Sequence, residues 1–284
     1  MSLRCGARFG GSNDDPERRP VMVGGGMKMK LAILGDLQLV SPDEPRDELR
    51  RRRKHFADAW PSFRPIADRI RKESPDLILS VGDLVDWYSV ENRDYVADLM
   101  NGLGIPWEAT PGNHDYSVYT WSQERGAYDY YSQGERWLEA DRGWKEGGIN
   151  FDNRTIDVGN TRLILMNSAF SGVLPGTREW LREQTRSEQR KILITHVPVD
   201  IPEVRDYILS ISPGRELAKY VQSHAPWLFD ECVRGRIGDV YSGHLHLPGR
   251  ITVDGTSMHL LGLSTISVGA TYPGMGQVTF LNID

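Results

Sequence analysis

Short apolar runs, each followed at once by a polar string, constrain the fold of this chain more than any other feature. Residues 31–34 and 77–81 have the length and composition of buried strands, and glycine followed by aspartate comes directly after each of them. A predicted helix over 90–103 precedes a third strand at 107–110. Strand, helix, strand, helix, strand is the rhythm of a parallel α/β sheet.

The rest of the chain continues this pattern. A helical stretch over 47–72 contains Pro61 and Pro65, so we expect it to break there and a second helix to begin near Ser62. Further helices are predicted over 178–186, with Thr177 as N-cap, and over 216–223. The second half is rich in predicted strands, at 150–158, 162–167, 191–195, 239–242, 250–253, 258–261 and 277–281.

No internal repeat or linker separates the two halves, so we predict one large α/β domain over residues 29–284. Residues 1–28 contain glycine-rich and Asn-Asp-Asp-Pro stretches without apolar periodicity, and they are expected to be a flexible leader. The alternative is that translation begins at a later methionine, Met27 or Met29.

Composition excludes several classes of protein. Of the 284 residues, 39% are hydrophobic and 26% charged, which is an ordinary globular composition. No apolar run approaches the roughly 18 residues that a membrane span needs. A net charge of −5 makes nucleic acid an unexpected partner, and two cysteines exclude a disulfide framework. We therefore expect a soluble cytoplasmic protein without membrane contact, and its oligomeric state stays open.

Five polar strings follow predicted strands. Ligands of open α/β sheets bind at the carboxyl ends of the strands, so these strings are expected to meet in one crevice. Four of the seven histidines lie within them. The strings are Gly35-Asp36-Leu37-Gln38, Gly82-Asp83-Leu84-Val85-Asp86, Gly112-Asn113-His114-Asp115, Thr195-His196-Val197-Pro198 and Gly243-His244-Leu245-His246.

Carboxylate, amide and imidazole groups together are the donors of a divalent-metal site. In an extended segment, His244 and His246 would point the same way and could reach two adjacent ions. Asp83 has two carboxylate oxygens and could bridge both ions. Two metals roughly 3.5–4 Å apart can clamp a phosphoryl group and activate a hydroxide.

The order of these motifs resembles that of the calcineurin-like metallophosphoesterase superfamily, and the motifs span residues 36 to 246. The resemblance implies a two-sheet α/β sandwich flanked by helices, with a dinuclear metal centre at its edge. Because the implied ligands come from both halves of the chain, it also implies a single domain.

The resemblance also implies a role for each motif residue. His114 would stabilise the transition state or protonate the leaving oxygen, and Asp115 would orient His114. The nucleophile would be metal-bound hydroxide. The implied ligands are Asp36 and His246 for the first metal, Asn113, His196 and His244 for the second, and Asp83 as the bridge.

Gln38 departs from the superfamily pattern, in which the first motif reads Asp-x-His. A glutamine could bind a metal only through its amide oxygen, and oxygen-rich sites favour harder ions. We therefore predict two divalent ions with manganese preferred at the first site, and iron or zinc as alternatives. The Asp-x-Gln variant also resembles the manganese-dependent branch that acts on ADP-ribose and CDP-alcohols.

An aromatic insert at about 116–149 follows the third string and shows few strand or helix signals. It is either a cap whose rings stack on a substrate or a cover over apolar surface. The candidate substrate-binding residues are Asp86, Tyr116, Tyr119 and Trp121. A second candidate loop, 200–215, comes soon after His196.

Residues outside the strings receive structural interpretations. The basic run 50–54 is expected on a solvated helix face, because Asp47 and Glu48 precede it at helical spacing. His55, His224 and His259 are expected to be structural or surface residues. Cys232 is expected to be a core residue in a helix.

The resulting prediction is a dinuclear metal-dependent hydrolase of a small-molecule phosphodiester or nucleotide diphosphate. A phosphomonoesterase or protein phosphatase with the same centre is the alternative. A catalytically weak scaffold with this fold is the second class; Gln38 favours it, and His114 argues against it.

Overall fold

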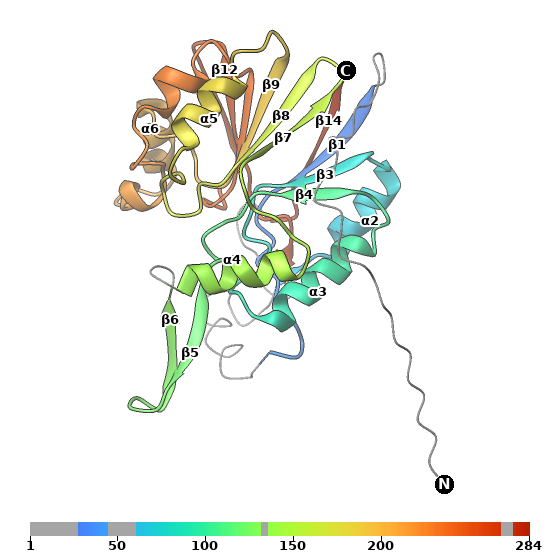
Figure 1. Ribbon diagram of the computed structural model, residues 1–284, viewed down its shortest axis with the longest axis vertical. Helices are drawn as coiled ribbons and strands as arrows, with labels where there is room; N and C mark the ends of the chain where they lie inside the picture. The colour runs from blue at the N-terminus through green and yellow to red at the C-terminus, as the bar shows by residue number, and fades with distance from the viewer. Residues whose placement is uncertain (1–27, 45–60, 132–135, 268–274) are drawn as a thin grey trace.

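The computed structural model describes residues 28–44, 61–131, 136–267 and 275–284 (Figure 1). Residues 1–27 of the predicted leader, the basic run 50–54 and His55 lie outside the described residues, as does the first part of the predicted helical stretch 47–72.

Two sheets form the centre of the molecule. The four-stranded sheet has the order β14-β1-β3-β4, with β1 (Met29–Leu34), β3 (Leu77–Ser80), β4 (Trp107–Ala109) and β14 (Val278–Ile283). The six-stranded sheet has the order β11-β12-β10-β9-β8-β7, with β7 (Arg154–Val158), β8 (Thr161–Met166), β9 (Arg190–Thr195), β10 (Asp239–Ser242), β11 (Gly249–Val253) and β12 (Thr256–Leu260). The inner strands are parallel, and β14, β7 and β11 are antiparallel edges.

The alternation of side chains along β1 shows how the sheets are buried on both faces. Leu31 and Ile33 point into a core that they share with Leu165 and Ile194 of the other sheet. The intervening side chains of β1 belong to a second core under the helices. Since side chains of a strand alternate between faces, a continuous apolar run requires cover on both sides.

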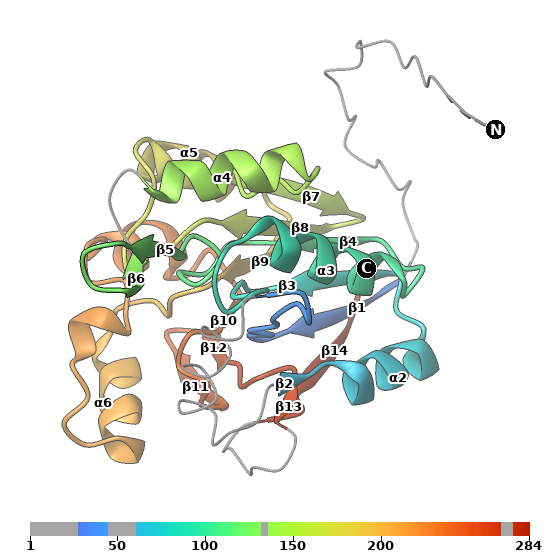
Figure 2. The same ribbon diagram turned by 90° about the horizontal axis from the view of Figure 1, so that it is seen from below.

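Helices supply that cover (Figure 2). α2 (Arg64–Glu73), α3 (Val90–Asn101) and α4 (Arg136–Glu146) share an apolar core with the four-stranded sheet. α5 (Thr177–Gln184), α6 (Pro202–Ile211) and the π-helix Phe229–Val233 pack on the six-stranded sheet. The predicted two-sheet α/β sandwich flanked by helices is confirmed.

Several sequence-based expectations were wrong in detail. The insert 116–149 contains a hairpin of β5 (Val118–Ser122) and β6 (Ala127–Tyr131), followed by α4, instead of irregular chain. In Figure 1 this hairpin extends away from the body. The predicted loop 200–215 contains α6, because Pro202 suits a helix start and Val204 and Ile208 form a buried stripe.

Helix ends and short elements also differ from prediction. The predicted helix 216–223 is only a 3-10 turn, Leu217–Lys219. Gly176, not Thr177, is the N-cap of α5, and no side chain caps it. The first strand of the second half begins at Arg154 and not at residue 150. A two-residue strand pair, β2 (Pro61–Ser62) with β13 (Ile266–Ser267), was not expected.

Residues assigned structural roles fall where expected. His259 stacks on Tyr241 at 4.3 Å between ring centres and its Nε2 lies 2.9 Å from an Asp239 oxygen. His224 is exposed, and Cys232 is buried within the π-helix. Among the described residues, no helix combines the length and apolar character needed to cross a membrane.

The core between the sheets can be tested with Leu79→Ala. Leu79 is fully buried there, so the substitution should lower the free energy of unfolding by about 2–5 kcal/mol, measured in urea. The control is Leu138→Ala on α4, where the side chain is 47% exposed and a change within about 0.5 kcal/mol is expected. Equal effects of the two substitutions would contradict this placement of Leu79.

Candidate metal centre

The five polar strings leave the carboxyl ends of β1, β3, β4, β9 and β10 at one edge of the sandwich. In the register of the parallel β1–β3 pair, Leu34 lies opposite Ser80, so Gly35-Asp36 and Gly82-Asp83 leave the sheet at adjacent positions. The amides of Leu37 and Gln38 donate to the Asp83 carbonyl at 2.9 and 2.8 Å. Backbone hydrogen bonds therefore bind the first two strings together.

Two groups of metal-ligating side chains meet at this edge, and Asp83 belongs to both. One group is Asp83, His196 and His244; the other is Asp36, Asp83 and His246. Within each group the candidate ligand atoms lie within 4.8 Å of one another. Five of the seven sequence-predicted ligands form these groups, and the other two are Asn113 and Gln38.

Asn113 and Gln38 lie beside the two groups. The Oδ1 atom of Asn113 is 3.2 Å from His196 Nε2. The Nε2 atom of Gln38 is 3.1 Å from His246 Nε2 and 3.4 Å from Asp83 Oδ2, while its Oε1 is buried without a hydrogen-bond partner. Turning the amide over would place the oxygen, which can bind a metal, against Asp83 and His246.

The hydrogen bonds of two candidate ligands, His196 and His244, decide which ring nitrogen of each could bind a metal. His196 Nδ1 lies 3.0 Å from the Val81 carbonyl, and His244 Nε2 lies 2.8 Å from the Lys219 carbonyl. A carbonyl only accepts, so these nitrogens carry the hydrogens and the opposite nitrogens keep their lone pairs. Such a second hydrogen bond is the usual partner of a metal-bound imidazole. The residues present therefore fit a pair of divalent ions.

Positive backbone φ angles concentrate in these strings. Gln38, Asp83, His244 and His246 have φ of 46°, 51°, 68° and 55°. They are four of the seven described non-glycine residues with positive φ. The expected extended conformation of His244 and His246 is therefore wrong. Their side chains nevertheless belong to different ligand groups. Strain of this kind is costly and clusters at functional sites.

Glycines in the motifs make room for the carboxylates. A Cβ at Gly112 would overlap the Asp83 carboxylate, and one at Gly243 would overlap that of Asp36. Each aspartate thus lies directly against the Cα of a glycine on the neighbouring string. Steric exclusion explains why glycine opens the third and fifth strings.

The surroundings of Asp83 and His244 favour the protonation states in which these side chains can bind a metal. Burial alone would raise the pKa of Asp83, but His196, His114 and His244 outweigh it and lower that pKa to about 2. Burial, and then the neighbouring His196, lower the pKa of His244 to about 3. At neutral pH, Asp83 is therefore a carboxylate and His244 a neutral imidazole, as ligands must be.

The structure places Asp86 against the His114 ring. The Nδ1 atom of His114 lies 2.8 Å from the Asp86 carbonyl and 3.2 Å from its carboxylate. The Asp115 carboxylate instead accepts the amides of Gly112 and Val85, at 2.8 and 3.2 Å. Burial, and then the charge of Asp83, raise the pKa of Asp115 well above its usual range. Asp115 thus ties the second and third strings together.

The three candidate aromatic residues lie in different surroundings. Tyr116 is 1% exposed and stacks on Phe170, and its hydroxyl bonds to Asp141 and Asn167, so it is a core residue. Tyr119 packs edge-on against Trp87, at 5.1 Å between ring centres. Trp121 lies on the projecting hairpin and is 44% exposed.

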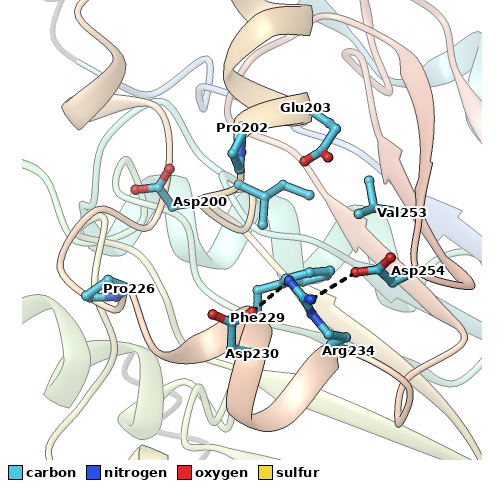
Figure 3. Close-up of a pocket in the computed structure, with 10 residues that line it drawn as sticks. Asp200, Pro202, Glu203, Pro226, Phe229, Asp230, Arg234, Val253 and Asp254 are labelled. Atoms are coloured by element: carbon cyan, nitrogen blue, oxygen red, sulfur yellow. Dashed lines mark ion pairs between the residues drawn. The ribbon is translucent and has the colours of Figure 1, made fainter.

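A separate cavity of about 260 Å³ lies between the start of α6, the π-helix and the β11–β12 turn (Figure 3). None of the motif residues lines it. Arg234 pairs there with Asp230 at 2.9 Å and with Asp254 at 3.2 Å, so the charges partly neutralise one another. This cavity has no part in the metal centre.

The sequence of residues 29–248 matches the calcineurin-like phosphoesterase family. The chain belongs to this family. The predicted superfamily is thereby confirmed, and the five strings at the sheet edge all lie within the matched residues.

Individual relatives are distant. The 3',5'-cyclic adenosine monophosphate phosphodiesterase CpdA of Pseudomonas aeruginosa is 28% identical over 154 residues, which are 51% of this chain and 48% of that protein. The match thus spans about half of the relative's length. A dimetal phosphatase from Danio rerio has a TM-score of 0.52 at 14% identity, covering 86% of this chain and 88% of the other. The phosphopantetheinyl hydrolase of Mycobacterium tuberculosis has a TM-score of 0.49 at 16% identity, covering 82% and 89%.

Gly112→Ala tests the close approach of Gly112 and Asp83. The new methyl group should displace the shared carboxylate and weaken Mn²⁺ binding at least about tenfold, measured by metal content after dialysis against graded Mn²⁺. The control is Gly238→Ala, whose Cβ would meet only the Lys191 carbonyl at 3.9 Å and should leave metal content unchanged. Full metal content in Gly112→Ala would contradict the proposed bridging position of Asp83.

Proposed function

We propose that this protein is a dinuclear metal-dependent hydrolase of phosphodiesters or nucleotide diphosphates. The observation that carries the proposal is the pair of ligand groups sharing Asp83, with the His114 amide 2.9 Å from the same carboxylate. Membership of the calcineurin-like phosphoesterase family supports the reaction class. The CpdA relative, named for a cyclic phosphodiester, favours diesters over monoesters.

The proposed first site consists of Asp36, Gln38 and His246, and the second of Asn113, His196 and His244, with Asp83 shared. When bound, the two ions would supply Lewis-acid stabilisation of phosphoryl charge and an activated water. Gln38 makes the first site rich in oxygen donors, which favours Mn²⁺ over Zn²⁺ there. Iron or zinc remain the alternative metals.

His114 is proposed to transfer a proton to the leaving oxygen. Because the Asp86 carbonyl only accepts, His114 Nδ1 carries a hydrogen, and Nε2 is the atom that exchanges a proton with the leaving oxygen. The Asp86 carboxylate at 3.2 Å stabilises the imidazolium form. Asp86 thus acts as a positioning residue for His114, and Asp115 supports His114 by joining the second and third strings.

The proposed substrates extend to ADP-ribose and CDP-alcohols, on the strength of the Asp-x-Gln motif. A phosphomonoesterase or protein phosphatase with the same centre is the alternative enzyme. A scaffold is disfavoured, because binding alone does not need the contacts that hold His114 beside Asp83.

Replacing His114 by alanine should separate catalysis from metal binding. The rate of bis-p-nitrophenyl phosphate hydrolysis with Mn²⁺ should fall about 10²- to 10⁴-fold while metal content stays the same. His224→Ala, on the exposed surface, is the matched control and should retain full activity. An unchanged rate in His114→Ala would remove the assigned role, and an inactive wild-type protein would favour the scaffold.

Gln38→His tests the metal preference. The added imidazole should raise the affinity of the first site for Zn²⁺ relative to Mn²⁺ by about tenfold or more. After stripping with a chelator, Mn²⁺ should restore wild-type activity better than Zn²⁺, and this order should weaken or reverse in the variant. Wild-type protein that retains two zinc ions against the chelator would contradict a manganese-preferring site.

A further inference from the structure

A short segment after α6 lies against the second ligand group. Residues 212–220 form a turn and the 3-10 helix Leu217–Lys219. The Lys219 carbonyl accepts from His244 Nε2 at 2.8 Å and from the Ser171 hydroxyl at 3.2 Å. The next residue, Tyr220, places its ring 5.3 Å from that of His244. The segment is thus attached to a proposed metal ligand through both backbone and side chain.

Arg215 lies on this segment, over the Tyr220 ring. Its guanidinium carbon is 4.3 Å from the ring centre, and Nη1 reaches the Leu245 carbonyl, between His244 and His246, at 3.4 Å. Two successive ring contacts therefore connect the guanidinium to His244.

Arg215 is half-buried, and no described carboxylate lies within ion-pair distance of it. The neighbouring Glu216 pairs with Lys219 at 2.6 Å. The adjacent carboxylate is therefore engaged by Lys219, while the Arg215 guanidinium is held in place by an aromatic face and a carbonyl.

A guanidinium held in this way suits a phosphate. Stacking on an aromatic ring lowers the entropy that a long side chain loses on binding, and the planar fork matches two phosphate oxygens. A phosphodiester brings one negative charge to the ligand groups, whereas a diphosphate ester brings a second. The second charge would need a cation beside the centre, and Arg215 is in that position.

Resting on the function proposed above, we propose that Arg215, stacked on Tyr220, binds the non-scissile phosphate of a diphosphate-linked substrate. The assigned substrate class is the nucleoside diphosphate ester, in preference to a diester that carries no second anion. Arg215 is a specificity-determining residue in this proposal. Metal binding does not depend on it.

The kinetic test compares ADP-ribose with bis-p-nitrophenyl phosphate, using Mn²⁺-loaded protein. Arg215→Ala should lower kcat/KM for ADP-ribose about ten- to hundredfold, mostly through KM, and leave that for bis-p-nitrophenyl phosphate within about twofold. Arg215→Lys should recover only part of the loss, because it keeps the charge without the planar fork. Arg205→Ala, which removes an arginine already paired with Asp200, is the control and should change neither value.

Equal losses for both substrates would overturn the proposal, since Arg215 would then support the centre generally. A wild-type enzyme that hydrolyses bis-p-nitrophenyl phosphate but not ADP-ribose, or an Arg215→Ala variant that retains full activity on ADP-ribose, would also overturn it.

A binding experiment separates failure of this inference from failure of the proposed function. Calorimetry with Mn²⁺-loaded protein compares α,β-methylene-ADP, whose P–C–P link resists hydrolysis, with AMP. Wild-type protein should prefer the diphosphate at least about tenfold, and Arg215→Ala should lose that preference. If the wild type hydrolyses neither substrate, the proposed function fails. The inference about Arg215 is then tested by the preference for the diphosphate alone. A wild-type protein without this preference, or an Arg215→Ala variant that keeps it, would overturn the inference.

Discussion

The buried carboxylate of Asp83 is the group on which the candidate centre depends. Asp36, Asp86 and Asp115 are buried close to it in the same strings, and burying so many acids together is costly. Backbone amides and imidazoles supply part of the compensation, including the His114 amide at 2.9 Å and His196 Nε2 at 3.5 Å. The remaining negative charge makes such a cluster suitable for divalent cations, and it would destabilise a core that held no cation.

Backbone geometry supports this concentration of charge. Gln38, Asp83, His244 and His246 each turn through left-handed φ angles, so their side chains leave the strand ends toward a common point. The sandwich holds them in this conformation, because β1 and β3 on one side and β9 and β10 on the other are buried on both faces. The conformational strain of these loops persists because the buried strands on either side fix the ends of each loop.

Buried residues of the aromatic insert, and not only its exposed side chains, contact the strings of the candidate centre. The Trp144 indole donates to the Asp115 carbonyl at 2.7 Å, and Tyr116 packs among aromatic side chains directly after the third string. The interpretation of the insert as a cover over apolar surface therefore holds for Tyr116. Trp121, on the hairpin, keeps an exposed face.

The sequence alone determined the parallel strand rhythm, the family and the set of candidate ligands, because the motifs consist of consecutive residues at the ends of short apolar runs. The division of the candidate ligands into two groups that share Asp83 was already implied by the family resemblance. Only the tertiary structure decided which groups face His114 and His196. The contact of Asp86 with the His114 ring and the stacking of Arg215 on Tyr220 depend on loop conformation. The first contact joins residues 28 positions apart in the chain, and the second depends on the path of the chain through the 3-10 helix Leu217–Lys219. Neither periodicity nor motif spacing encodes a side chain's final direction.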